Sequence, residues 1–211
     1  MRIVVGITGA SGSAFGVEFL RRCPEEKFLI LTKWGRHVLR EETGLTSQLL
    51  AEHVKRLFPD EPMLRNKYYY DSPPEFVVTA RRGAELVGFR IIVRRITQAG
   101  ERSIRTAGIG IAVDPAHQRS GVGTRLTERT LAHLSELGDE LVIAFMLSRA
   151  AEGLLLSHGF ARLRTRITYI ERETGKLAEE AMPCYARALD GEALLQEIEA
   201  RGSLHLGMGT W

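Results

Sequence analysis

The stretch AGIGIAVDPAHQRSGVGTRLTERTLAHLSEL, residues 107–137, decides the fold. Its first part, Ile109–Val113, is apolar and rich in β-branched residues, which predicts a buried strand. Asp114-Pro115 ends that strand, because proline cannot donate a hydrogen bond to a sheet. A helix is expected over residues 121–137, since its apolar positions fall on one face, namely Val122, Leu126, Leu131 and Leu134.

The junction between that strand and that helix has the chemistry of a phosphate cradle. The first turn of a helix exposes backbone N–H groups and the positive end of the helix dipole. Gly121 and Gly123 carry no side chains, so a phosphate can approach the backbone closely, and Arg119 adds a positive charge. The alternative is an ordinary strand–loop–helix joint in which the glycines serve only packing.

The spacing of this junction is more specific than a pair of glycines. The pattern Val-x-Pro-x-x-(Gln/Arg)-x-x-Gly-x-Gly, between a strand and a helix, resembles the acyl-CoA-binding core of the GNAT N-acetyltransferase family. The matching residues are Val113, Pro115, Gln118, Gly121 and Gly123. The resemblance implies an α/β (α+β) fold with a mixed, mostly antiparallel twisted sheet, helices on both faces, and acetyl-CoA as cosubstrate.

The same resemblance implies which residues hold the cosubstrate. The pyrophosphate would lie on the loop formed by Gln118, Arg119, Ser120, Gly121, Val122, Gly123 and Thr124. The pantetheine would bind, like an added strand, to the backbone of Ile111, Ala112 and Val113. One of these three amides would also polarise the thioester carbonyl, in the manner of an oxyanion hole.

The composition bounds the remaining possibilities. A length of 211 residues suits one domain, or one domain with an appendage, and 44% hydrophobic with 26% charged residues is normal for a soluble globular protein. The net charge of +3 is small and spread out, so it does not indicate nucleic acid, although it suits an anionic cofactor. Two distant cysteines predict a reducing cytoplasm and no metal site. No apolar run is long enough to span a membrane.

Residues 1–45 have a different character. They start as strand, glycine loop, helix and strand, and MRIVVGITGASGSAFGVEFL with LILTKWGRHVLREETGL resembles the N-terminus of the flavin prenyltransferase family. That resemblance implies flavin mononucleotide at Gly9, Ala10, Ser11, Gly12 and Thr32. It stops near Leu45, and a doubly wound flavin fold needs more strands than the two present, so flavin binding is not expected.

We therefore predict two domains, a fragment of flavin-prenyltransferase type over residues 1–45, left by a gene fusion, and an acyltransferase over residues 46–211. The strand expected at Lys27–Thr32 is also a candidate for the first strand of the transferase sheet. In the second domain, apolar periodicity predicts helices and strands. The helices are expected at 47–58 and 148–158, and the strands at 76–80, 85–97, 104–113, 141–147, 162–171 and 184–189. The last two strands are expected to form an antiparallel pair.

Two features concern the acceptor. Residues 87–123 are similar to the aminoglycoside 2'-N-acetyltransferase and nodulation-acyltransferase branch of the family, and the chain ends in a glycine-rich tail and Trp211. In that branch the terminal tryptophan and its carboxylate lie near the acceptor, which makes Trp211 a candidate substrate-binding residue; simple packing is the alternative. Tyr70 is a second candidate for lining the acceptor pocket; the alternative is packing with the ring buried and the hydroxyl in solvent. Ile109 replaces an acidic residue of that branch.

The groups for proton transfer are less well defined. The tyrosine that protonates the leaving thiolate in the family corresponds to Leu155, so Tyr185, Ser157 or water would have to act instead. An ammonium acceptor must also lose a proton before it attacks. Glu75, just before a predicted strand, is the candidate base, with a plain surface carboxylate as the alternative. His117 beside the cradle is the weaker candidate, because a solvated loop residue is the more frequent case.

The sequence thus predicts a cytoplasmic N-acetyltransferase. It would move the acetyl group from acetyl-CoA to a primary amine of a small molecule by direct attack, and a homodimer is one assembly it could form. A non-catalytic acyl-CoA-binding or sensing module is the main alternative, because the usual general acid and one acidic contact are absent. A flavin-binding protein acting through residues 1–45 is the third hypothesis.

Overall fold

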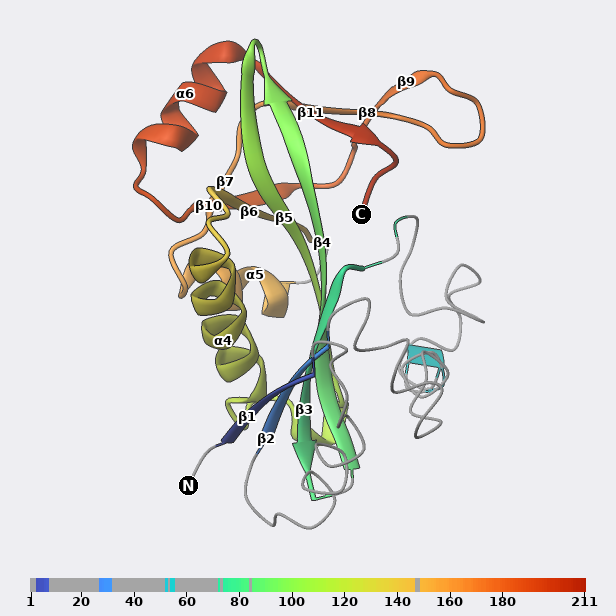
Figure 1. Ribbon diagram of the computed structural model, residues 1–211, viewed down its shortest axis with the longest axis vertical. Coiled ribbons are helices and arrows are strands. Elements are labelled where there is room, and N and C mark those ends of the chain that lie inside the picture. The colour runs from blue at the N-terminus through green and yellow to red at the C-terminus, as the bar shows by residue number, and fades with distance from the viewer. Residues whose placement is uncertain are drawn as a thin grey trace. The chain divides into compact units, whose positions relative to one another are not determined.

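The computed structural model describes residues 3–7, 27–31, 52, 54–55, 72, 74–83, 85–146 and 149–211 (Figure 1). The chain divides into two compact units, the first made of Met1–Ile92 and Ile111–Leu126, and the second of Val93–Gly110 and Thr127–Trp211. Three elements contribute residues to both units, and these are β4 (Glu85–Ala99), β5 (Arg102–Val113) and α4 (Val122–Glu136). The predicted domain boundary between residues 45 and 46 lies outside the described residues and stays a prediction.

The first unit begins the sheet with strands from the N-terminal segment. These strands are β1 (Ile3–Ile7), β2 (Lys27–Leu31) and β3 (Phe76–Arg82). β1 pairs with β2 in parallel, and β2 pairs with β3 antiparallel (Figure 1). β3 in turn pairs antiparallel with β4. The strand predicted at residues 27–32 is therefore confirmed as a strand, Lys27–Leu31, that joins this sheet, but β1 and not β2 is the first strand in the sheet order.

A small apolar cluster stabilises this unit. Val54, Val77, Phe89 and Ala112 are buried together. Gly88 on β4 makes close packing possible, because an added Cβ would lie 3.1 Å from the Ala112 carbonyl oxygen and 3.2 Å from Val122 Cγ1. The start of α4 can thus approach the sheet closely, which positions the loop that precedes it. Of the helix predicted at 47–58, the described residues Glu52, Val54 and Lys55 are helical.

The second unit holds the rest of the sheet and two helices. The strands are β6 (Leu141–Phe145), β7 (Ala161–Arg162), β8 (Arg166–Ile170), β9 (Leu177–Glu179), β10 (Cys184–Ala188) and β11 (Ser203–Met208). The helices are α5 (Arg149–Leu156) and α6 (Ala193–Arg201). The strand order runs β5-β6-β10-β7, while β11 pairs with both β4 and β8, and β9 pairs with β8. The pairs β5–β6 and β8–β11 are parallel.

The core of this unit packs β6, β8, β10 and β11 against α6. Its buried residues are Ala99, Ile104, Leu141, Ile143, Leu163, Ile167, Cys184, Ala186, Leu194, Ile198, Leu204 and Leu206. Leu194 and Ile198 bring one face of α6 into this cluster because they are four residues apart. No helix within the described part of the chain is both long and apolar enough to cross a membrane.

The expectation of one strand over residues 162–171, paired with 184–189, was wrong. Of the predicted strand, only its start pairs with β10, as β7, with Arg162 opposite Tyr185. The chain then leaves β10, because the amide of Arg164 donates to the Glu199 carboxylate at 2.9 Å and the amide of Arg166 donates to the Gly202 carbonyl at 3.3 Å. These contacts with the end of α6 direct β8 to β11 instead.

Asp139 forms a buried ion pair whose loss should lower stability. Its side chain is only 2% exposed, and Arg94 Nε lies 2.8 Å from Oδ2 and 3.1 Å from Oδ1. Arg94→Met would leave this carboxylate in a poorly hydrated place without its guanidinium. We expect the free energy of unfolding, measured by urea denaturation, to fall by about 3 kcal/mol. Arg166→Met, which breaks an exposed pair with Glu179, should cost less than about 1 kcal/mol. Equal losses in the two variants would contradict this prediction.

Candidate active site

The loop between β5 and α4 is held in shape by its own hydrogen bonds. Asp114 caps the short helix η2 (Pro115–His117), and its Oδ1 accepts a backbone amide of that helix at 3.0 Å. Gln118 Nε2 donates to the Val113 carbonyl at 3.3 Å, and Ser120 Oγ donates to the carbonyl at the end of η2 at 2.6 Å. The path of the backbone from strand to helix is thus fixed within the loop.

The backbone of this loop presents unpaired amides. Gly121 has φ 82°, and Arg119, with φ 59°, is the one non-glycine residue with positive φ among those described. Left-handed residues next to right-handed ones turn successive N–H groups toward one side and form an anion-binding concavity. Within the described part of the chain, no acceptor is found for the amides of residues 119–122. The predicted phosphate cradle therefore has the geometry that an anion requires.

Arg125 adds a positive charge that the sequence analysis missed. It lies one turn inside α4, and its Nη2 donates to the Ser120 carbonyl at 3.3 Å. The guanidinium lies against Gly121, since an added Cβ there would be 2.9 Å from Nη1. The spacing of four residues from Gly121 could have indicated it, because residues four apart are neighbours on a helix. Together with the exposed Arg119, this gives the loop two cations.

Tyr185 is held by a carboxylate partner. It is buried on β10, opposite Ala144 of β6, and its hydroxyl donates to Glu152 on α5. The hydrogen bond to Glu152 raises the pKa of Tyr185 above its usual value, and burial adds to the shift. Leu155, at the place of the family's tyrosine, is 1% exposed and belongs to the core. Tyr185 is therefore a protonated phenol at neutral pH, and its partner Glu152 lies one helical turn before Leu155 on α5.

The other predicted acid–base and acceptor residues are less informative. Glu75 directly precedes β3, is half-buried, and its amide donates to the Ile92 carbonyl at 2.8 Å. It belongs to the first compact unit, whereas Tyr185 belongs to the second. Tyr70 lies outside the described residues. The roles assigned to these residues stay predictions.

Trp211 lies where the pairing of two strands ends. β5 and β6 are in register from Thr106–Leu141 to Gly108–Ile143, and the last two residues of β6 have no β5 partner among the described residues. An added Cβ on Gly108 would overlap the Trp211 ring. The ring centroid is 6.3 Å from that of Phe145, and the buried indole Nε1 has no hydrogen-bond partner in the described part of the chain.

Two residues that the sequence analysis missed fix the C-terminal tail. Arg95 Nη1 donates to the carbonyls of Leu206 at 3.3 Å and Gly209 at 2.6 Å, and Nη2 donates to that of Thr210 at 3.2 Å. Its Cζ also lies 5.1 Å from the centroid of the Trp211 ring, a cation–π contact. Thr210 Oγ1 donates to Glu180 Oε2 at 2.9 Å. The tail is thus held from both β4 and the segment after β9.

Cys184 should be chemically inert. Its side chain is 3% exposed, and burial, with a smaller contribution from the charge of Glu180, raises the pKa of its thiol to about 12. Because only the thiolate is nucleophilic, a Cys23→Ser variant should show no reaction with an aromatic disulfide reagent at pH 8 in the folded state. One thiol should react after denaturation. Rapid labelling of the folded protein would contradict the prediction.

Comparison with known proteins gives the family of this chain. Residues 45–160, more than half of the chain, match the model of the acetyltransferase (GNAT) family. A probable UbiX-like flavin prenyltransferase of Streptomyces sp. (strain D7) is 50% identical over 50 residues, which is 22% of this chain and 25% of that protein. The chain therefore spans about a quarter of the length of this curated relative.

Three solved structures are similar to this chain to different degrees. Arabidopsis thaliana NAA60, in complex with acetyl-CoA, is 12% identical, with a TM-score of 0.50 over 79% of this chain and 99% of that one. A GNAT acetyltransferase from Staphylococcus aureus Mu50 is 14% identical, with a TM-score of 0.47 over 77% and 99%. yncA from Salmonella typhimurium, a putative acetyltransferase with acetyl-CoA, is 21% identical, with a TM-score of 0.40 over 56% and 66%.

The likeness to the Arabidopsis protein confirms the predicted fold class, a mixed α/β fold with a mostly antiparallel sheet. At this level of identity the likeness shows the fold alone. The match to the family model shows the family as well, because it covers more than half of the chain, including the loop between β5 and α4. The chain belongs to the GNAT acetyltransferase family.

Proposed function

We propose that this chain transfers an acetyl group from acetyl-CoA to a primary amine of a small molecule by direct attack. The observation that carries the proposal is the loop after β5, where four unpaired amides and the cations Arg119 and Arg125 form an anion site. Acetyl-CoA is the cosubstrate, in keeping with the family and with the Arabidopsis structure of this fold, which contains it.

The proposed roles follow from the chemistry of the thioester. The loop over residues 118–124 holds the diphosphate, and the backbone of Ile111, Ala112 and Val113 holds the pantetheine. The neutral amine attacks the thioester carbonyl carbon, the C–S bond breaks, and the sulfur leaves as a thiolate that accepts a proton. An amide of the β5 end stabilises the negative charge that develops on the carbonyl oxygen. Glu75 is the proposed base that removes a proton from the amine.

Tyr185 is the proposed proton donor to the thiolate. Since Glu152 keeps the pKa of this phenol above its usual value, Tyr185 remains protonated throughout the neutral and mildly alkaline range. Tyr185→Phe should therefore lower kcat about tenfold or more, with an unchanged KM for acetyl-CoA. Ser157→Ala, which alters the other candidate hydroxyl, is the matched control and should leave kcat unchanged. The same kcat for both variants would remove Tyr185 from the mechanism.

The small-molecule acceptor is supported by the C-terminal tail. Trp211 lies at the end of the β5–β6 pairing, and residues 87–123 are similar to the aminoglycoside and nodulation branch of the family. We propose that residues 1–45 are a fragment of flavin-prenyltransferase type, supported by the 50-residue match, which contributes β2 to the sheet without binding flavin. The low cysteine count favours the cytoplasm as the place of reaction.

Thermal melting and thiol release together test the proposal. Saturating acetyl-CoA should raise the melting temperature, because a ligand that binds only the folded state stabilises it. Thiol release should then depend on an added primary amine and not on an alcohol of the same skeleton. A thermal shift without turnover across a broad amine panel would favour the acyl-CoA-binding module, which the replacement of the family's tyrosine by Leu155 also favours. No thermal shift would overturn the cosubstrate assignment.

A further inference from the structure

The guanidinium of Arg119 is not used by the protein itself. Its side chain is exposed, and within the described part of the chain it forms no hydrogen bond and no ion pair. The polar side chains on either side of it are occupied. Gln118 donates to the Val113 carbonyl at 3.3 Å, and Ser120 donates to the His117 carbonyl at 2.6 Å. Among these three consecutive side chains, that of Arg119 is thus the one available to a ligand.

The backbone of Arg119 agrees with a role for its side chain. With φ 59° it has a left-handed conformation, which few residues other than glycine adopt. Glycine would adopt this conformation at a lower energetic cost, because it has no Cβ. Such unfavourable backbone conformations are frequent at ligand sites, where the side chain or the backbone serves binding.

Arg125, the second cation of the loop, is placed differently. It is half-buried, its Nη2 donates to the Ser120 carbonyl at 3.3 Å, and an added Cβ on Gly121 would lie 2.9 Å from its Nη1. Its guanidinium is therefore fixed against the backbone of the loop, next to the unpaired amides of residues 119–122. A group bound by those amides also meets Arg125, whereas Arg119 supplies its charge at the exposed side of the loop.

Acetyl-CoA carries its negative charge on separate groups. The diphosphate is the group that we propose for the amides and Arg125. The phosphomonoester on the 3′-oxygen of the ribose is close to doubly charged at neutral pH, since the second pKa of such a group is about 6. It is one ribose ring away from the diphosphate. An exposed guanidinium at the edge of a diphosphate site suits this second anion, because it can donate two parallel hydrogen bonds to one phosphate.

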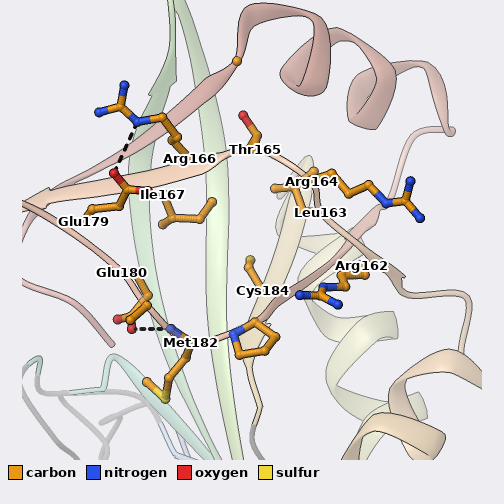
Figure 2. A pocket seen from close by; sticks show the side chains of 13 residues that line it. Arg162, Leu163, Arg164, Thr165, Arg166, Ile167, Glu179, Glu180, Met182 and Cys184 are labelled. Atoms are coloured by element: carbon orange, nitrogen blue, oxygen red, sulfur yellow. Dashed lines mark hydrogen bonds and ion pairs between the residues drawn. The ribbon is translucent and has the colours of Figure 1, made fainter.

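A second group of arginines lines an open cavity of ≈ 680 Å³ in the second unit, and it is less suited to a phosphate (Figure 2). These residues are Arg162, Arg164 and Arg166. Arg166 is paired with Glu179 at 3.3 Å, and Glu180 belongs to the same lining. The negative charge of these carboxylates opposes an anion in the cavity. Arg164, whose guanidinium points away from the cavity in Figure 2, provides a control for the loss of positive surface charge.

We propose that Arg119 binds the 3′-phosphate of acetyl-CoA, so that the chain selects coenzyme A over its 3′-dephospho form. The inference rests on the proposed function and gives Arg119 a ligand group of its own. The amides and Arg125 cannot make this selection, because both forms contain the same diphosphate. The pair of guanidinium and phosphate is exposed to solvent, so it weakens as the salt concentration rises.

Calorimetric titration of the full chain, without an acceptor, compares coenzyme A with 3′-dephospho-coenzyme A. The unmodified chain should bind coenzyme A about tenfold more tightly, and sodium chloride should reduce this preference. Arg119→Gly should remove the preference by weakening the binding of coenzyme A alone. Arg119→Lys should retain part of it, because lysine keeps the positive charge without the paired hydrogen bonds.

Two control variants show whether the preference belongs to Arg119. Arg125→Met should weaken the binding of both forms by the same factor and keep the preference, because this cation lies against the amides. Arg164→Met, in the second unit, should leave both affinities unchanged. Equal binding of the two forms by the unmodified chain, or an equal loss for both in Arg119→Gly, would overturn the inference while acetyl-CoA remains the cosubstrate. Binding of neither form would overturn the proposed function as well.

Thermal melting separates ligand binding from a structural role of Arg119. Without a ligand, Arg119→Gly should melt at about the same temperature as the unmodified chain, because glycine accommodates the left-handed conformation and no contact of the side chain is lost. With saturating coenzyme A, its rise in melting temperature should be smaller than that of the unmodified chain. A marked fall in the melting temperature without a ligand would show that the side chain stabilises the loop, and would overturn the inference.

Discussion

Gly121→Glu is expected to weaken acetyl-CoA binding by about 100-fold or more. Two effects combine. A side chain at φ 82° strains the backbone, and a Cβ there would lie 2.9 Å from Arg125 Nη1. The new carboxylate would also pair with Arg125 and place a negative charge beside the amides of residues 119–122, where the diphosphate is proposed to bind. Isothermal titration with acetyl-CoA measures the loss directly.

Gly83→Glu is the control for this substitution. Gly83 belongs to the same compact unit, has a similar φ of 59°, and has no neighbouring atom within 4 Å of an added Cβ. The Gly83→Glu variant therefore has a similar backbone strain and the same added negative charge, but at a position outside the loop. Its affinity for acetyl-CoA should remain that of the unmodified chain. An unchanged affinity in Gly121→Glu would mean that the loop does not hold the diphosphate.

Gly108→Ala should displace Trp211 and with it the contact that we propose for the acceptor. The added Cβ would overlap the indole ring, so the ring has to leave its place against β5 and Phe145. In a Trp34→Phe background, which leaves one tryptophan, the fluorescence maximum should move to longer wavelength. We expect the KM for the amine to rise about tenfold, with the KM for acetyl-CoA unchanged, and the free energy of unfolding to fall by about 2 kcal/mol.

Gly153→Ala on α5 is the matched control, because nothing lies within 4 Å of its added Cβ. It should leave the fluorescence and both KM values unchanged and stabilise the helix by up to about 1 kcal/mol. An unchanged KM for the amine in Gly108→Ala, together with the expected shift in fluorescence, would show that Trp211 packs without contacting the acceptor. The fluorescence reading thus separates a role in binding from one in packing.

The elements with strong periodicity could be predicted from the sequence nearly to their ends. The strand expected at 85–97 is β4, Glu85–Ala99, and the helix expected at 121–137 is α4, Val122–Glu136. Both are long, and their apolar residues recur at the period of the element, so local pattern is sufficient. The loop proposed to hold the diphosphate could be singled out for a similar reason, since its glycines, proline and glutamine are close together in sequence.

The fold of the C-terminal third depends on contacts between residues far apart in the sequence, which a local pattern cannot predict. β8 pairs in parallel with β11, which is some forty residues further along the chain, with Ile167 opposite Leu204. β9 has only three residues, and neither it nor α6 was predicted. The hydrogen-bond partners of the candidate site residues also lie far from them in the sequence. Glu152 meets Tyr185 across 33 positions, and Glu180 meets Thr210 across 30.

The position of β2 has a consequence for how the N-terminal segment can change. β2 covers the outer edge of β3 over five residue pairs, from Lys27–Arg81 to Leu31–Val77. An uncovered edge strand is a template for aggregation, because its amides and carbonyls remain open to pairing with another chain. Backbone groups do this shielding, and they are the same in every residue except proline. Deleting residues 1–31 would therefore uncover the edge of β3, whatever side chains the deleted strands carry.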